Sequence, residues 1–390
     1  MTTTAYPPSV GGVQAHVAEL RARLERFEAD VVTLWLQHRT DWLRGSTIAL
    51  DGTVTTEVEP GLTKLGWDQA TRQRMLPWVL SYYANPALAA RRIAQAMAPY
   101  VEQVVGSDHV LIHNHRIGRE FLARASLMVA RKRAIPFVLT PHHHPRWRGY
   151  RYQGWIDVYR EADAVLVLTN AEREEMRRLG VKPERIHVTW SAADPPLPAD
   201  ANRFRGLLGG TLDPIVLFVG QLYRYKGVAE LVEATEAVRA KGVPVALVFI
   251  GPSTDFSKRF FARRKRPWLH VLGVVDDQTK WDALEAAEVV ALPSQHEAFG
   301  RVFLEAWSKG KPVIGPRIPA VTDVITGGKN GLLVDPASPG ELARALQHVL
   351  TDQQFAAALG AAGRQEVAER FSWDAVVDRV EAVYGQLLRP

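Results

Sequence analysis

Apolar and polar positions follow two recurring patterns along this chain. Short continuous apolar runs, such as PIVLFVG (214–220) and VALVFIG (245–251), have the length of strands that are buried on both faces. Between such runs, apolar residues recur every three or four positions, for example over 228–241 and 278–287, which predicts helices. The alternation predicts right-handed βαβ units, and therefore an α/β fold built on parallel sheets with both faces covered.

The other predicted elements follow the same two patterns. Further strands are predicted at VVTLWL (31–36), HVLIH (109–113), PFVLT (136–140), AVLVLT (164–169), RIHVTW (185–190), WLHVLG (268–273), VVALPS (289–294) and PVIGP (312–316). Further helices are predicted over 14–29, 85–104, 117–133, 170–179 and 302–309. The segment TIALDGTVTTEVE (47–59) is an exception, because its Asp51-Gly52 pair between alternating residues predicts a β-hairpin.

The pattern is interrupted once, over 191–210, which is rich in Pro, Asp, Ala and Gly and has little periodicity. This composition predicts a linker between two domains. A doubly wound sheet binds ligands where its strand order reverses, so the expected site is the cleft between two such domains. The last segment, 371–388, is amphipathic, and its pattern alone predicts a helix packed on the second domain.

Composition narrows the function classes. The 390 residues include no cysteine, which excludes disulfides, thiolate metal sites and cysteine nucleophiles. The N-terminus lacks the basic and apolar regions of a signal peptide, and no apolar run is long enough to span a membrane. A cytoplasmic protein is therefore expected. The formal charge of +6 favours anionic partners.

The most informative segment is EAFGRVFLE, in which Glu297 and Glu305 flank a Phe-Gly turn after an apolar strand. Gly300 lets the backbone approach a ligand closely. The helix predicted from Val302 closes at Gly310, and its free N–H groups suit a phosphate. The two carboxylates can accept hydrogen bonds from sugar hydroxyls on either side of that phosphate. Phosphate between polyhydroxyl groups describes a nucleotide-sugar.

Two glycine-containing loops are further candidates for binding phosphate. Gly11-Gly12 precedes a helical pattern and could bring backbone amides against a diphosphate, although a simple turn is the alternative. FVGQLYRYKGV places Arg224 and Lys226 at the carboxyl end of a buried strand, where they could neutralise a diphosphate leaving group. The alternative for that loop is a solvated basic surface.

Histidines cluster in HNH (113–115) and PHHHP (141–145). A metal site is disfavoured because three consecutive histidines cannot easily face one ion. We expect His142 to hydrogen-bond a sugar, whereas His143 and His144 are either ligand contacts or packing residues. The segment 256–268 has six basic residues and no acidic ones. It could contact an anionic membrane, bind nucleic acid, or form a solvated basic face; no nucleic-acid motif accompanies it.

Several segments, in order and over nearly the whole chain, resemble the family 4 retaining glycosyltransferases. These segments are PPSVGGVQ, FVLTPHHHP with ADAVLVLTNAEREEM, VGQLYRYKGV, ALPSQHEAFGRVFLEAWSKGKPVIG, KNGLLVDPASPGELARAL and FSWDAVVDRVEAVY. The resemblance implies the GT-B architecture of two Rossmann-like doubly wound domains facing a central cleft. It implies an acceptor-binding domain over 1–195, a nucleotide-sugar donor-binding domain over 196–370, and a helix over 371–390 that crosses back to the first domain.

The resemblance also implies residue roles. Gly12 and Lys226 would bind the donor diphosphate, and Glu297 would hydrogen-bond the donor sugar. His142 would lie near the sugar and the acceptor, and Glu305 would bind the ribose. Amides near the sugar or phosphate would come from Phe299, Gly300 and Arg301, and the base would lie near Val274, Val275, Asp277 and Lys280. Of these residues, His142, Lys226 and Glu297 would be catalytic.

Three features depart from the family pattern. Gln221 stands where the family usually has arginine, so Arg224 supplies the charge or phosphate affinity falls. TWSAAD (189–194) replaces the family's Pro-Asn-Gly-Val-Asp. The first strand is reduced to MTTTAY, which implies a short strand or a truncated start.

The resulting hypothesis is a retaining glycosyltransferase that moves a sugar from a UDP- or GDP-sugar to a hydroxyl acceptor without a metal or other cofactor. A lipid-linked acceptor, a polysaccharide or a small metabolite would fit, and the basic surface allows peripheral contact with the inner face of a membrane. The alternatives are an epimerase or phosphorylase of the same architecture, or a binding protein without turnover, which the Gln221 departure suggests. The base, the sugar, the linkage and the oligomeric state are left open by the sequence.

Overall fold

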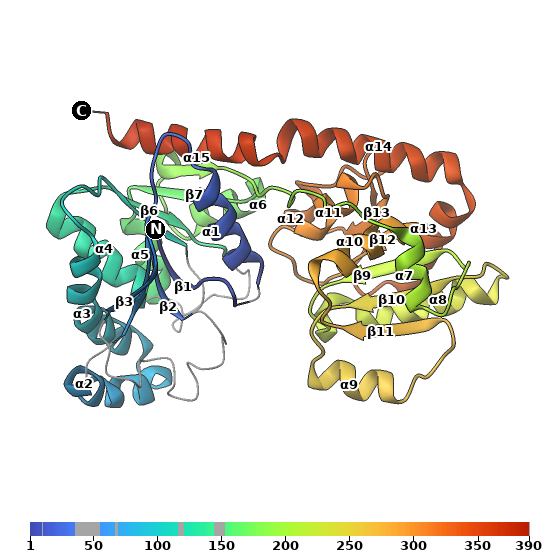
Figure 1. Cartoon of the computed structure of the whole chain (residues 1–390), viewed down its shortest axis with the longest axis horizontal. Helices are drawn as coiled ribbons and strands as arrows, with labels where there is room; N and C mark the ends of the chain where they lie inside the picture. Colours follow the sequence, from blue (N-terminus) through green and yellow to red (C-terminus); the bar gives the residue numbers. More distant parts are fainter. Residues whose placement is uncertain (10, 36–54, 67–68, 116–120, 144–152, 390) are drawn as a thin grey trace. The chain divides into compact units, whose positions relative to one another are not determined.

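A computed structural model of the chain describes residues 1–9, 11–35, 55–66, 69–115, 121–143 and 153–389. They form two compact units, each an α/β structure around its own sheet (Figure 1). Unit 1 consists of Met1–Trp190 and Trp373–Pro390, and unit 2 consists of Ser191–Ser372. Ser191 begins unit 2 because the segment after it is already tied there: the N–H of Ala193 donates to the carbonyl of Phe371.

The sheet of unit 1 has the order β3-β4-β2-β1-β5-β6-β7-β8. Neighbouring strands are parallel except β3 and β4, which are antiparallel. The strand order reverses between β1 and β5. The strands are β1 (Thr2–Ala5), β2 (Val31–Trp35), β3 (Thr55–Glu59), β4 (Leu62–Leu65), β5 (Ile112–His115), β6 (Phe137–Thr140), β7 (Ala164–Val167) and β8 (Ile186–Val188).

Helices cover this sheet and contain much of its core. α4 packs on β1, β5 and β6, α3 packs on α4, and α15 packs on α1. The helices of unit 1 are α1 (Gly12–Arg23), α2 (Gln69–Leu80), α3 (Pro86–Val104), α4 (Phe121–Arg133), α5 (Gln153–Glu161), α6 (Asn170–Arg178) and α15 (Trp373–Leu387), with 3₁₀ turns η2 (Ser81–Tyr83) and η4 (Pro183–Arg185).

The C-terminal helix α15 packs on unit 1, whereas its apolar pattern alone predicts packing on the second domain. The buried Glu381 of α15 accepts the backbone N–H groups of Glu25 and Arg26, each at 2.8 Å. The hydroxyl of Tyr384 lies 2.5 Å from Nδ1 of the buried His113. The same contacts explain why α1 ends at Arg23 and not near residue 29, since the amides after it are bound by Glu381 in place of helix carbonyls.

The sheet of unit 2 is fully parallel and has the order β11-β10-β9-β12-β13-β14. Its order reverses between β9 and β12, so the carboxyl ends of these two strands border the crevice where doubly wound sheets bind ligands. The strands are β9 (Ile215–Val219), β10 (Ala246–Ile250), β11 (Leu269–Gly273), β12 (Val289–Ala291), β13 (Val313–Pro316) and β14 (Leu332–Val334).

The helices of unit 2 cover this second sheet. α8 packs on α13, and α11 packs on α14. The helices are α7 (Ala201–Leu207), α8 (Val228–Ala240), α9 (Asp255–Ala262), α10 (Asp277–Ala286), α11 (Arg301–Ser308), α12 (Pro319–Thr322), α13 (Pro339–Thr351) and α14 (Gln353–Arg370), with the 3₁₀ turn η5 (Arg224–Lys226).

The linker predicted over 191–210 is partly wrong, because it contains α7. The side chain of Asp200 accepts the first free amides of this helix, and Phe204 is fully buried. The guanidinium of Arg203 forms an ion pair with the buried Asp282 of α10. α7 is short and buries a single aromatic side chain, so its sequence has too few apolar residues to show a helical periodicity.

Two other strand predictions concern residues 47–59 and 109–113. Asp51 and Gly52 lie outside the described residues; the described hairpin joins β3 to β4 through Gly61, whose φ is 72°. β5 begins at Ile112 and not at His109, because the polar run 113–115 is itself buried in the sheet. No helix of the described residues is both long and apolar enough to cross a membrane.

Candidate functional site

Opposite charges meet at the point where the strand order of unit 2 reverses. Lys226 follows β9 and Glu297 follows β12, and Lys226 Nζ lies 2.6 Å from Glu297 Oε2. Both side chains are mostly buried, with 16% and 14% of their surface exposed. Sequence analysis placed both residues in the site, and the fold brings them into contact.

Two glycines shape the loops that carry this ion pair. Gly227 has φ of 78°, and a Cβ at this position would lie 2.3 Å from the carbonyl oxygen of Pro293. The loop after β9 therefore packs directly against the loop after β12, and the N–H of Gln295 donates to the carbonyl of Tyr225 at 2.7 Å. A side chain at Gly227 would force these two loops apart.

The amino end of α11 borders the same loops. Gly300, with φ of 87°, caps the helix without a side-chain hydrogen bond, which leaves backbone N–H groups of the first turn available to an anion. Phe299 is buried and packs edge-on against Phe371, with ring centroids 5.8 Å apart. Phe299 thus anchors the turn, and the helix presents its positive dipole end to the crevice.

A second pair of opposite charges lies one turn further along α11. Lys280 Nζ of α10 is 3.2 Å from Glu305 Oε1, and only 8% of Glu305 is exposed. Burial alone would lower the pKa of Lys280, but the carboxylates of Glu305 and Asp194 together raise it above its ordinary value. Lys280 is therefore charged at neutral pH, and Asp194 lies close enough to contribute to that charge.

Asp194 is a site residue that sequence analysis missed. It forms an ion pair with the guanidinium of Arg301, the first residue of α11. Asp194 lies in the segment that leads from unit 1 into unit 2, where it ends the TWSAAD run. The only signal in the sequence was that this acid stands where the related Pro-Asn-Gly-Val-Asp pattern also ends in Asp.

The other predicted residues of unit 2 are more exposed. Gln221 and Arg224 lie at the surface of the loop after β9, and Arg224 pairs with no carboxylate of the described residues. After β11, Val274 is 66% exposed and Val275 is half-buried. Asp277 is exposed and lies 3.6 Å from Lys280. These side chains follow the carboxyl ends of β9 and β11.

The predicted residues of unit 1 lie at the carboxyl edge of its own sheet. Gly12 is the first residue of α1 and is exposed, and a Cβ there would meet nothing within 4 Å. His142 follows β6 with φ of 43°, a backbone conformation that is strained for a residue with a side chain. His143 is buried, its amide donates to Glu172, and its ring lies near the hydroxyl of Tyr159, which makes it a packing residue. His144 lies outside the described residues.

Behind His142 lies a cluster of buried imidazoles that sequence analysis did not assemble. The ring centroid of His115 is 4.0 Å from that of His113, 5.8 Å from that of His16 and 6.0 Å from that of His142. Burial, and then the neighbouring imidazoles, lower the pKa of His115 well below its ordinary value; burial likewise lowers the pKa of His113. Within the described ranges, no group of three or more His, Asp or Glu side chains is arranged to hold a metal ion.

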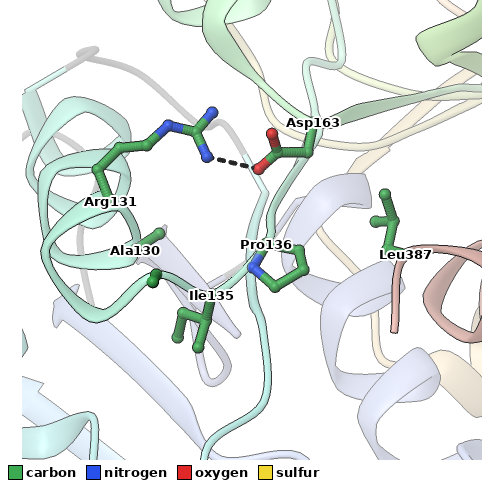
Figure 2. Close-up of a pocket in the computed structure, with 7 residues that line it drawn as sticks. Ala130, Arg131, Ile135, Pro136, Asp163 and Leu387 are labelled. Atoms are coloured by element: carbon green, nitrogen blue, oxygen red, sulfur yellow. Dashed lines mark hydrogen bonds and ion pairs between the residues drawn. The ribbon is translucent and has the colours of Figure 1, made fainter. Parts of the chain in front are cut away.

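A pocket of about 370 Å³ lies in unit 1 at the amino ends of β6 and β7 (Figure 2). There Arg131 Nη1 is 2.7 Å from Asp163 Oδ2, and Asp163 also accepts the N–H of Phe137. The charge of the arginine is thus already neutralised. Ligands of parallel sheets bind at the carboxyl ends of strands, so this pocket is not the candidate site.

The carboxyl edge of this sheet therefore combines a helix amino end, two partly buried lysines, the partly buried Glu297 and the buried Glu305. The lysines and the backbone N–H groups suit phosphate oxygens, and the glutamates suit hydroxyl groups. Each lysine is already paired with a glutamate, so a ligand must offer both kinds of group to replace both partners. A phosphate attached to sugars has this composition.

Comparisons with known proteins identify the family of the chain. The model of the family described as glycosyl transferases group 1 matches residues 204–366, and that of the glycosyl transferase 4-like domain matches residues 11–189. The chain is 26% identical to an alpha-maltose-1-phosphate synthase of Mycolicibacterium smegmatis over 99% of this chain and 98% of that protein. It is 33% identical to a D-inositol 3-phosphate glycosyltransferase of Xylanimonas cellulosilytica over 64% of this chain and 62% of that protein.

Solved structures share the fold. The structure of Anabaena Alr3699/HepE in complex with UDP and glucose superposes with a TM-score of 0.74 and 17% identity, covering 99% of this chain and 100% of that one. A sucrose-phosphate synthase from Thermosynechococcus elongatus gives a TM-score of 0.74 and 20% identity over 99% of each chain. The predicted α/β architecture of two parallel sheets is confirmed. The chain belongs to the group 1 glycosyltransferases of the GT-B fold and is a glycosyltransferase.

Proposed function

We propose that this enzyme is a retaining glycosyltransferase that moves a sugar from a nucleoside diphosphate sugar, with UDP or GDP as the carrier, to a hydroxyl acceptor. The observation that carries the proposal is the Lys226–Glu297 ion pair at the amino end of α11, where the strand order of unit 2 reverses. The name of the Anabaena structure, which contains UDP and glucose, supports a UDP-sugar as one candidate donor.

Each side chain of the crevice has a role in this proposal. Lys226 and the N–H groups of Gly300 and Arg301 bind the diphosphate, and Glu297 accepts hydroxyl groups of the transferred sugar. Glu305 accepts the ribose hydroxyls, and the base lies near Val274, Val275, Asp277 and Lys280. Gln221 and the exposed Arg224 border the phosphates.

The proposed chemistry needs no protein nucleophile. The bond between the anomeric carbon and the phosphate oxygen breaks, the acceptor oxygen bonds to the same face of that carbon, and the departing phosphate oxygen takes the acceptor proton. Negative charge grows on the diphosphate as the bond breaks, so Lys226 and the helix amides bind the transition state more strongly than the ground state. In this scheme the protein's own cations supply the positive charge at the leaving group, and no metal takes part.

The acceptor in this proposal is a hydroxyl-bearing molecule. A lipid-linked sugar, a polysaccharide or a small metabolite would fit this description. The relatives named above act, by their names, on inositol 3-phosphate and in the synthesis of maltose 1-phosphate, so a phosphorylated sugar or cyclitol is a candidate small acceptor. A lipid-linked acceptor would bring the enzyme to a membrane surface.

A ligand panel followed by a turnover assay tests the proposal. Thermal unfolding is measured with UDP, GDP, ADP and their glucose conjugates at equal concentrations. The preferred nucleotide should raise the melting temperature most, because stabilisation grows with the logarithm of ligand concentration over Kd. The protein is then incubated with the preferred donor, labelled in the sugar, and candidate acceptors. Transfer with retention at the anomeric carbon supports the proposal. An epimerised donor, or binding without turnover across the acceptor set, would support the alternatives and refute it.

A further inference from the structure

A strongly basic surface lies on unit 2, on α9 and the residues that follow it. α9 is at the lower right of Figure 1. Every exposed residue between 256 and 266 except Ala262 is lysine or arginine. We call this set the α9 basic surface: Lys258, Arg259, Arg263, Lys265 and Arg266.

The inner face of α9 fixes this surface in place. Ser257 is fully buried and closes a capping box with Thr254, and the ring of Phe261 packs against Phe249 of β10 with centroids 5.1 Å apart. Arg264 turns back over the ring of Phe260, with Cζ 4.1 Å from the ring centroid. The apolar side chains and one arginine are therefore used in packing, and the remaining cations are directed to the outer face.

Carboxylates neutralise little of this charge. Within the described residues, the one ion pair of the surface joins Arg266 to Glu236 at 3.8 Å, and Arg259 donates only to the backbone carbonyl of Asp255. The contrast with α6 is clear, because there Arg177 and Arg178 both pair with glutamates of their own helix. The α9 basic surface thus has an excess of cations that internal pairing does not explain.

The kind of side chain indicates the kind of partner. Binding to single-stranded nucleic acid relies on exposed aromatic rings on which bases stack. Here Phe256 stacks on Phe260, both partly buried, and Trp268 is covered by Arg239. Cations without exposed aromatics match a surface of closely spaced anionic head groups, near which each lysine or arginine strengthens binding severalfold.

We propose that the α9 basic surface binds the anionic phospholipid head groups of a membrane. The binding is electrostatic and peripheral, because the apolar face of α9 is occupied by the sheet. This inference does not depend on the proposed sugar transfer. It would hold for any reaction that unit 2 supports.

The test is co-sedimentation of the full chain with vesicles of phosphatidylcholine alone and of phosphatidylcholine mixed with phosphatidylglycerol. The test variant combines Lys258→Gln, Arg259→Gln, Arg263→Gln and Lys265→Gln. The matched control combines Arg74→Gln, Arg91→Gln, Lys182→Gln and Arg344→Gln, which are exposed, scattered cations with the same total charge. Thermal unfolding and nucleotide binding verify that both variants are folded.

We expect the unaltered chain to bind the anionic vesicles, to release them at high salt, and to ignore phosphatidylcholine alone. The test variant should lose roughly a hundredfold in partitioning, whereas the control should stay within about threefold of the unaltered chain. Equal loss in both variants would show that only net charge matters and would overturn the proposal. Binding of the unaltered chain to RNA or DNA with no binding to anionic vesicles would overturn it as well.

Discussion

The two sheets of this enzyme present very different chemistry at equivalent edges. In unit 2, the carboxyl ends of the strands carry ion pairs, Lys226 with Glu297 and Lys280 with Glu305. In unit 1, the corresponding edge carries imidazoles, and burial lowers the pKa of His113 and His115 so that these two are neutral at pH 7. The same doubly wound plan thus supports a charged crevice in one unit and a neutral, histidine-lined edge in the other.

This difference in side chains shows that the same sheet architecture can support different chemistry at the carboxyl edge of each unit. Paired charges can be exchanged for the charges and hydroxyl groups of a ligand, which is why we propose a phosphate ester as the ligand of unit 2. Buried neutral imidazoles cannot supply fixed charge, but they offer hydrogen-bond donors and acceptors and a packed support for the strained His142. The fold shows where a ligand binds, whereas the side chains at that edge show which ligand it is.

Removal of the Lys226 charge tests whether unit 2 supplies the cation at the leaving group, and we expect it to change activity more than any other variant described below. Lys226→Ala should lower the rate of sugar transfer by roughly a hundredfold or more, because the leaving diphosphate loses its principal cation. Steady-state kinetics with the preferred donor measures this change. Lys241→Ala, at an exposed lysine of the same unit, is the control and should leave the rate unchanged. A Lys226→Ala enzyme with the full transfer rate would remove the proposed role.

A second change tests whether unit 1 depends on the C-terminal helix. Glu381→Ala should lower the free energy of unfolding of unit 1 by about 2 kcal/mol, because it leaves the backbone N–H groups of Glu25 and Arg26 without their carboxylate acceptor. Urea unfolding measures the loss, and Glu184→Ala, at an exposed position, should stay within about 0.5 kcal/mol. Unit 2 should keep its nucleotide affinity. A loss of that affinity with unit 1 intact would contradict the assignment of α15.

Acid should destabilise unit 1 at a higher pH than it destabilises unit 2. Burial holds the pKa of His113 and His115 below 6.5, so the unfolded chain takes up protons there before the folded chain does. Their contribution to stability is present above pH 6.5 and is lost as the pH falls below it, by about tenfold in the unfolding equilibrium per histidine at one pH unit lower.

In unit 2, the contribution of Asp282 to stability is not lost between pH 6.5 and pH 5.5. Its hydrogen bond from Arg203 lowers the pKa of Asp282 from 3.8 to about 2, so that contribution is lost only as the pH falls below about 4. Hydrogen exchange at pH 7.5 and pH 5.5, corrected for intrinsic rates, should show peptides of β5 and β6 opening first. Earlier opening of peptides from β9 and β12 would contradict the comparison.

A smaller effect is expected at the Lys280–Glu305 ion pair, where a single substitution tests whether Glu305 contacts the nucleotide. Glu305→Gln should weaken nucleotide binding by about tenfold, since an amide is a weaker acceptor for ribose hydroxyls and leaves Lys280 without its partner. Isothermal calorimetry with the preferred nucleoside diphosphate measures the affinity. Glu341→Gln, on α13, serves as the control. Unchanged affinity in Glu305→Gln would refute contact between Glu305 and the nucleotide.

The sequence predicted the fold best where strands are buried on both faces. β6, β7, β9 and β10 are continuous apolar runs, and their positions follow directly from that pattern. β5 was placed too early because its own residues are polar and find partners inside the sheet: His113 bonds Thr140, and Asn114 bonds Thr2. Apolar periodicity cannot reveal a strand whose burial depends on hydrogen bonds from distant strands.

The same limit applies to the site. Lys226, Glu297, Lys280 and Glu305 stand in local motifs, so the sequence could propose all of them, and the structure pairs them as described. Asp194 lies far from α11 in the chain, and nothing local links it to Arg301. His16 and His115 converge only because β1 and β5 are neighbours. Residues that act through tertiary neighbours carry no short sequence signal.

The pairing of Lys226 with Glu297 has a consequence for turnover. In the proposed reaction, a nucleoside diphosphate that has lost its sugar still binds Lys226 but leaves Glu297 without either its cation or a hydroxyl group. An intact donor satisfies both members at once. We therefore expect this site to bind the intact sugar donor more tightly than the nucleoside diphosphate product, so that transfer of the sugar itself promotes product release.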